Sequence, residues 1–215
     1  MSLLFTPKEF SEEGKEMAVE ALLENAMPDR DFYLLVIASI ILAASGILTD
    51  SIPVFIASMI VAPLAYPILS LGLGAVTNDI RLMLRSFGII VISMLLAIVI
   101  AGIFSLFAKS YFIVVYDRVF INFSPNYFFD LLIAVVFGAV ASYGLMRPKV
   151  GGAMTGIGIA VSLMPPLVAT GIGLFDPSSG LAGPAFIIFL LNIFGILIAS
   201  MITFSFFGIK GAAAK

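Results

Sequence analysis

Six long runs of apolar residues alternate with short polar segments, and this alternation limits what the chain can fold into. Most runs have about 20 residues, the length that crosses a hydrocarbon core of about 30 Å as an α-helix. Of all residues, 61% are hydrophobic and 11% charged, whereas soluble domains are about 45–50% apolar and about 25% charged. The runs cover residues 32–48, 54–76, 86–107, 127–145, 150–174 and 184–207. We therefore expect an all-α membrane protein with six transmembrane helices.

The charged residues lie mainly outside these runs, and they divide the chain into three parts. Eight of the 13 Asp and Glu residues precede residue 32, so the acidic balance belongs to a short tail. That tail begins polar and acidic, unlike a secretory signal, so the first helix would act as its own insertion signal. We expect an acidic cytoplasmic segment over residues 1–30, a transmembrane domain over 31–208 and a cytoplasmic tail over 209–215.

Lys and Arg residues indicate the orientation of the six helices. They are far more frequent on one side of the predicted bundle, and cytoplasmic loops carry such an excess. Without the distant Lys8, eight lie on that side: Lys15, Arg30, Arg81, Arg85, Arg147, Lys149, Lys210 and Lys215. The other side holds Lys109 and Arg118. The distribution predicts a multi-pass protein of the cell membrane with both termini in the cytoplasm.

The second and fifth apolar runs contain related proline-bearing segments, IASMIVAPLAYPILSLGLG (56–74) and IAVSLMPPLVATGIGLF (159–175). Placing Pro63 on Pro166 superposes an Ile-Ala pair and two Leu residues. Each half of the chain then has three spans. Since three is odd, the second half must enter the membrane from the opposite side. We predict two inverted three-helix repeats, repeat one over 31–107 and repeat two over 127–208, with proline-broken helices two and five.

Proline lacks a backbone N–H, so inside a helix it leaves the carbonyl four residues earlier without its usual donor. Such backbone persists at membrane depth where it is buried in protein, bonded by Ser, Thr or water, or lining a wet cavity. Simple kinks that are satisfied locally are one interpretation. A binding site near the membrane midplane is the other, because broken helices at corresponding positions of two halves are typical of transport sites.

Two polar residues accompany the prolines. The Tyr66 hydroxyl has two equally weighted roles, a bond to a freed carbonyl or contact with a solute. Asn192, in the middle of the sixth run, acts either as interhelical glue or in the site. Ser58 and Ser162 lie close to the freed carbonyls in sequence. The predicted substrate-binding residues are Ser58, Pro63, Tyr66, Ser162, Pro165, Pro166 and Asn192.

Aspartates near the predicted helix ends have simpler explanations. Asp50 and Asp79 fit turns and helix caps. Asp130 lies one turn into the fourth run, where an interfacial position is the preferred interpretation and an ion or proton site the alternative. Small residues such as Gly138 and Ser142 are spaced to let helices approach closely, within one subunit or in a homo-oligomer, and both remain open.

The segments 45–79 (SGILTDSIPVFIASMIVAPLAYPILSLGLGAVTND) and 152–175 (GAMTGIGIAVSLMPPLVATGIGLF) resemble the two signature segments of a prokaryotic membrane family known as domain of unknown function 389. The similarity extends over about residues 30–207, nearly the whole hydrophobic region. The resemblance implies a membrane protein without an assigned activity. Many relatives carry a folded cytoplasmic domain before the spans, where this chain has a short tail.

The residue inventory disfavours catalysis. The chain has no Cys and no His, which removes thiol and imidazole chemistry and the usual zinc ligands. Nucleic-acid binding has no basic patch to support it. We expect no enzyme activity, cofactor or metal, and partners limited to the lipid bilayer and a small solute or ion. The sequence therefore favours a transporter or channel over the alternative, a non-transporting membrane scaffold or sensor subunit.

Overall fold

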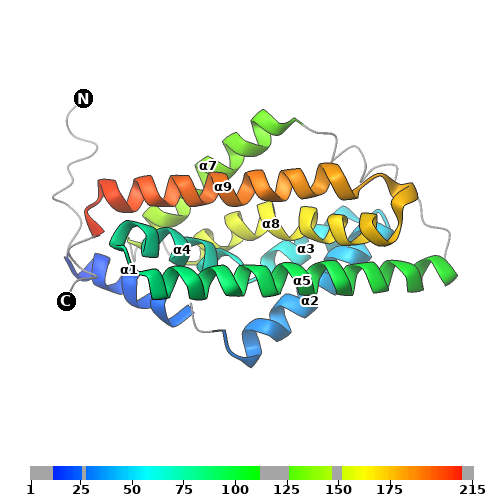
Figure 1. The fold of residues 1–215 in the computed structure, drawn as a ribbon, viewed down its shortest axis with the longest axis horizontal. Helices are drawn as coiled ribbons and strands as arrows, with labels where there is room; N and C mark the ends of the chain where they lie inside the picture. Colours follow the sequence, from blue (N-terminus) through cyan, green and yellow to red (C-terminus); the bar gives the residue numbers. More distant parts are fainter. Residues whose placement is uncertain (1–11, 26–27, 112–125, 147–151, 210–215) are drawn as a thin grey trace.

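In a computed structural model, residues 12–25, 28–111, 126–146 and 152–209 are described, and helices are their only extended regular structure. Side chains 152–162 lie outside the described part. The helices are α1 (Glu12–Asn25), α2 (Arg30–Leu48), α3 (Ile52–Val61), α4 (Ala65–Thr77), α5 (Ile80–Tyr111), α7 (Tyr127–Leu145), α8 (Gly152–Phe175) and α9 (Ala182–Phe206), with the 3-10 turn η2 (Pro177–Ser179) before α9. Figure 1 shows them as one elongated bundle.

Short turns and caps set the helix boundaries. Asp29 accepts a 2.8 Å hydrogen bond from the Phe32 N–H at the start of α2. Asp50 has φ 51° in the turn before α3. Asp79 accepts a 3.0 Å bond from the Leu82 N–H in the first turn of α5. The turn and cap predicted for Asp50 and Asp79 are thus confirmed.

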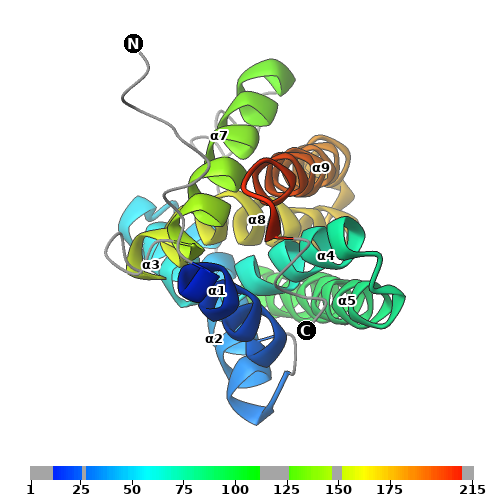
Figure 2. The same ribbon diagram turned by 90° about the vertical axis from the view of Figure 1, so that its left-hand side faces the viewer.

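The helix α8 lies at the centre of the bundle. It packs against α2, α3, α4, α5, α7 and α9, and the end-on view of Figure 2 shows these helices arranged around it. Each residue from Leu163 to Gly173 is buried. A helix that is buried on all sides needs no polar face, which agrees with the almost uniformly apolar sequence of this part of α8.

The outer helices expose large apolar side chains. Examples are Leu84 on α5, Phe128 on α7 and Ile202 on α9, each more than 60% exposed. Four helices, α2, α5, α7 and α9, are long and apolar enough to cross a membrane, and α3 with α4 forms a fifth candidate if this bent pair is one span. The apolar helices fit a multi-pass membrane protein.

One prediction about the prolines is correct and the other is wrong. The second apolar run is broken, because α3 ends at Val61 and α4 starts at Ala65 with a 46° bend between them. The fifth run is not broken. Its helix α8 continues from Gly152 to Phe175 through both Pro165 and Pro166.

Close contacts between small residues hold neighbouring helices together. A Cβ atom added at Gly138 of α7 would lie 2.7 Å from the Ile196 Cα atom of α9. Ser142, one turn further along α7, is buried and donates a 2.7 Å hydrogen bond to the Gly138 carbonyl. The small-residue face predicted around Gly138 therefore packs within the chain.

The acidic segment predicted before the bundle contains the helix α1, which packs against the bundle. Ala18, Val19 and Leu22 of α1 are buried, and α1 contacts α4. The buried Ser70 hydroxyl of α4 donates a 2.9 Å hydrogen bond to the Leu22 carbonyl. In Figure 1, α1 (blue) and the end of α9 (red) lie at the same end of the bundle.

Candidate functional site

The clearest irregularity in the bundle is the break between α3 and α4, at Ala62, Pro63 and Leu64. Ala62 has an extended backbone, φ −70° and ψ 121°, as expected for a residue whose helical conformation would clash with a following proline. Leu64 returns to helical angles and starts α4 without a side-chain cap. Pro63 thus ends one helix and allows the next to begin in a new direction.

Two helix ends meet at this break. The last carbonyl groups of α3 and the first N–H groups of α4 have no partner within their own helices. The carbonyl end carries a partial negative charge and the N–H end a partial positive one. Main-chain groups of both polarities are therefore available within a few residues, next to an otherwise apolar chain segment.

Two local contacts show how the neighbouring proline and serine are accommodated. Pro67 is the third residue of α4, a first-turn position whose N–H has no helical partner in any case, so it breaks nothing. The buried Ser58 hydroxyl donates to the Phe55 carbonyl, at 2.6 Å. It does not donate to the Met59 carbonyl, the group that Pro63 leaves free.

The other predicted site residues occupy different surroundings. Tyr66 lies in the first turn of α4, half-buried against the apolar core. Pro165 and Pro166 are buried in the continuous helix α8. Asn192 is 5% exposed on α9. The side chain of Ser162 lies outside the described part of the chain.

The structure brings together the helices that carry these residues. The helix α3 packs on α8, and α8 packs on both α4 and α9. Leu64 beside the break belongs to the same buried cluster as Leu163 and Leu167, which flank the α8 prolines. The described side chains at this junction are mostly apolar, so main-chain groups supply much of its polarity.

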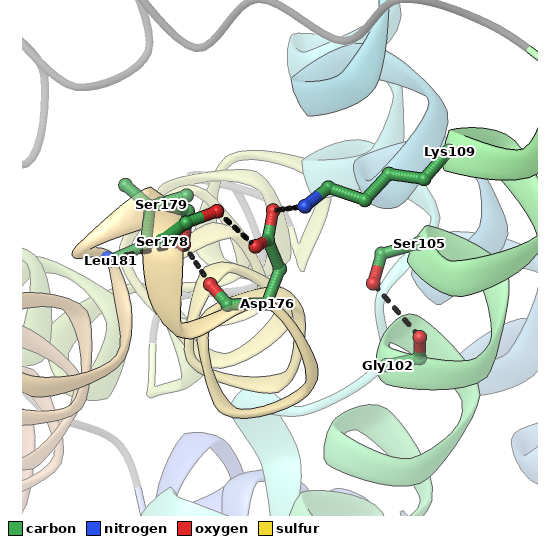
Figure 3. A network of polar contacts seen from close by, with 7 residues as sticks. All are labelled: Gly102, Ser105, Lys109, Asp176, Ser178, Ser179 and Leu181. Carbon is green, nitrogen blue, oxygen red and sulfur yellow. Dashed lines mark hydrogen bonds and ion pairs between the residues drawn. The ribbon is translucent and has the colours of Figure 1, made fainter.

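A second polar cluster, absent from the predicted site, lies where α5 and α8 end (Figure 3). The Lys109 ammonium forms an ion pair with the Asp176 carboxylate, which is 4% exposed. The Ser178 hydroxyl donates to the other Asp176 carboxylate oxygen at 2.5 Å, and the Ser179 hydroxyl donates to the Asp176 carbonyl at 2.7 Å. A carboxylate beside a helix C-terminus is disfavoured by the helix dipole. The positive charge of Lys109 offsets this unfavourable interaction at Asp176.

Two features of the sequence lie at this cluster, a lysine and a turn segment, but neither predicts the ion pair. Lys109 contributed only to the Lys and Arg distribution that predicts the orientation of the helices in the membrane. The run Asp176-Pro177-Ser178-Ser179-Gly180 has the composition of a turn. Nothing in the sequence joins residues 109 and 176, because their pairing depends on how α5 packs on α8.

Asp130, the aspartate with two interpretations, lies in the first turn of α7. Its backbone N–H donates to the Asn126 carbonyl at 3.1 Å. A negative charge is favourable at that helix end. This position agrees with the preferred interpretation of a residue near the end of the helix.

Comparisons with known proteins place the chain in a family. The uncharacterized protein MJ0678 of Methanocaldococcus jannaschii is 28% identical over 217 residues, which cover 97% of this chain and 66% of the relative. The chain thus spans slightly less than two thirds of that relative's length. No solved structure matches. The model of the family described as "Domain of unknown function (DUF389)" matches residues 59–198, and the chain belongs to this family.

Proposed function

We propose that the protein is a membrane transporter or channel for a small solute or ion, with its site at the α3–α4 break. The observation that carries the proposal is that break, an interrupted helix packed against the buried helix α8. Exposed main-chain groups inside a membrane protein are costly unless something satisfies them. A solute that binds and leaves is one such partner, and discontinuous helices commonly serve this purpose in transporters.

The proposed topology has six spans in two inverted halves, with α2 to α5 in one half and α7 to α9 in the other. In this arrangement α8 is the fifth span, and the end of the bundle that holds α1 faces the cytoplasm. The Lys and Arg distribution supports this orientation. The halves differ in their middle span, which is interrupted in the first and one continuous helix in the second.

We further propose that Ser58, Pro63, Tyr66, Ser162, Pro165, Pro166 and Asn192 surround the solute, without any catalytic role. The break itself would supply the main contacts through the end groups of α3 and α4. Tyr66 would add a hydroxyl from the first turn of α4. The α8 prolines would contribute hydrogen-bond acceptors, because they have no N–H to donate to the Val161 and Ser162 carbonyls.

Flux measurements test this function. The purified protein would be reconstituted in liposomes and screened against ions and small neutral solutes, with empty liposomes as the reference. We expect flux of at least one solute, reduced about tenfold by Pro63→Ala because the site geometry changes. The matched control Gly88→Ala, at a position with open space around it, should retain full flux.

A non-transporting scaffold or sensor is the second candidate. It is favoured by the burial of Leu64, Leu163 and Leu167 in the apolar core of the bundle. The absence of flux for every solute tested, from protein that remains folded in the liposomes, would favour this second function over the first.

A further inference from the structure

The buried hydroxyl groups of the described helices fall into two classes. Most donate a hydrogen bond to a main-chain carbonyl, which is the usual way that Ser and Thr are accommodated in apolar helices. Members of this class are Ser39, Ser58, Ser70, Ser105, Ser142, Thr170 and Ser200. Ser86 and Ser93 form the other class, because each is at most 1% exposed and its hydroxyl has no hydrogen-bond partner.

Both exceptions lie on α5, on the same side. They are seven residues apart, close to two helical turns, so their side chains project in nearly the same direction about 10 Å apart along the axis. Ala97 and Ala101 continue this buried side. A Cβ atom added at Gly171 of α8 would lie 3.1 Å from the Ala101 Cβ atom, which shows that this side of α5 reaches the central helix.

A buried hydroxyl without a partner is unfavourable, and it is more so in a low-dielectric interior. A serine in a helix can satisfy its hydroxyl by donating to a carbonyl of the same helix. Ser105 of α5 does so, with a 2.8 Å hydrogen bond to the Gly102 carbonyl. Ser86 and Ser93 do not form such a bond. Both side chains are buried on a helix that packs against α2, α4 and α8.

We infer that Ser86 and Ser93 are two hydrogen-bonding positions on a track along α5 that takes small uncharged polar molecules, water included. This inference rests on the proposed transport function and narrows its substrate class. A hydroxyl both donates and accepts hydrogen bonds, so it suits a neutral polar group. No charged residue occurs between Arg85 and Lys109, and an ion would cross that length without a counter-charge on α5.

The position of the track agrees with the other polar features of the structure. The helix α4, which begins at the break, packs against α5. At the far end of α5, Ser105 and then Lys109 face the Asp176 cluster (Figure 3). The two hydroxyls therefore lie on a helix that packs against α4 and ends at the ion pair.

Cysteine accessibility tests the inference directly, because the natural chain has no Cys. Ser86→Cys and Ser93→Cys would be made in the full chain, reconstituted in liposomes and treated with neutral hydroxyethyl methanethiosulfonate or its cationic trimethylammonioethyl analogue. Ser142→Cys is the matched buried control, since Ser142 is equally buried but bonded to its own helix. Ser110→Cys, on the exposed end of α5, is the reactive control.

A thiol reacts as its thiolate, which a hydrated site favours and a dry apolar site suppresses. We expect the neutral reagent to modify Cys at positions 86 and 93 about tenfold faster than at position 142, and faster than the cationic reagent does. Equal, slow reaction at positions 86, 93 and 142 would overturn the track. Equal rates with the two reagents at position 93 would overturn its preference for neutral molecules.

The outcome is separate from that of the transport assay. Fast modification without flux of any solute would reject the transport function while retaining the polar track. Flux together with slow modification would reject the track and leave the function in place. Ser93→Ala gives a second check if a cysteine variant fails to fold. If Ser93 belongs to the track, this variant should lower the flux of neutral solutes. Unchanged flux would mean that Ser93 has only a structural role.

Discussion

Two proline-containing segments of this protein have opposite structures. At Pro63 the helix stops, Ala62 becomes extended, and α4 leaves at an angle of 46° to α3. At Pro165 and Pro166 the helix α8 continues without interruption, although two adjacent prolines remove two hydrogen bonds. Proline content alone would have predicted the reverse, with the stronger break in α8.

The surroundings of the two segments explain this difference. From Leu163 to Gly173 every residue of α8 is buried, with helices packed on all sides. Close packing strongly penalises a bend in such a helix, because its neighbours would have to move with it. Around the break, Ala62 and Leu64 are buried, but Ile60 is 58% exposed and Pro63 is half-buried, so one side of the chain has no neighbouring helix. There the chain can bend without disturbing a complete shell of neighbours.

The largest effect is expected where α8 packs most closely on α5, at Gly171. A Cβ atom there would lie 2.7 Å from the Ile98 carbonyl oxygen of α5. Gly171→Val should therefore lower the free energy of unfolding in detergent by about 3 kcal/mol. Gly88→Val is the control, because nothing lies within 4 Å of that position. Equal stability of the two variants would show that tight packing around α8 does not constrain this helix.

The ion pair at the end of α8 should have the next effect. Lys109→Met removes the ammonium group that pairs with the buried Asp176 carboxylate and should cost about 2 kcal/mol, less than for a fully buried pair because Lys109 is 38% exposed. Adding Asp176→Asn should recover most of this loss. Thermal unfolding of both single variants and the double variant gives the coupling, and strictly additive losses would contradict the pairing.

Replacing the prolines tests whether local sequence or packing sets each helix direction. Pro63→Ala should let α3 and α4 straighten, while changing stability by about 1 kcal/mol or less. Spin labels on Ser51→Cys and Thr77→Cys, at the two ends of the pair, would report a longer distance. Pro166→Ala should leave that distance unchanged. An unchanged distance in the Pro63 variant would mean that packing imposes the bend.

The smallest effect is expected where α1 supports α4. Ser70→Ala removes the hydrogen bond to the Leu22 carbonyl and should cost about 1 kcal/mol. Cleavage within α1 by a protease should become faster, since the helix opens more often. Ser142→Ala, which removes a bond within one helix, is the control and should not alter this cleavage.

Several features could be predicted from the sequence because they depend on neighbouring residues. The apolar runs predicted the apolar helices, and turn residues such as Asp50 and Asp79 were assigned correctly. The family resemblance is confirmed by the match over residues 59–198. The break at Pro63 also followed from local chemistry, because a proline forces its preceding residue toward an extended conformation.

Other features depend on residues far apart in the chain. The pairing of Lys109 with Asp176, the bond from Ser70 to Leu22 and the continuity of α8 through its prolines all arise from helices packing side by side. The burial of Ser86 and Ser93 likewise depends on which side of α5 faces its neighbours. Hydropathy reports whether a segment avoids water, and this is a property of the segment alone. Whether a proline bends its helix depends on the free-energy cost of moving the surrounding helices, which no local pattern contains.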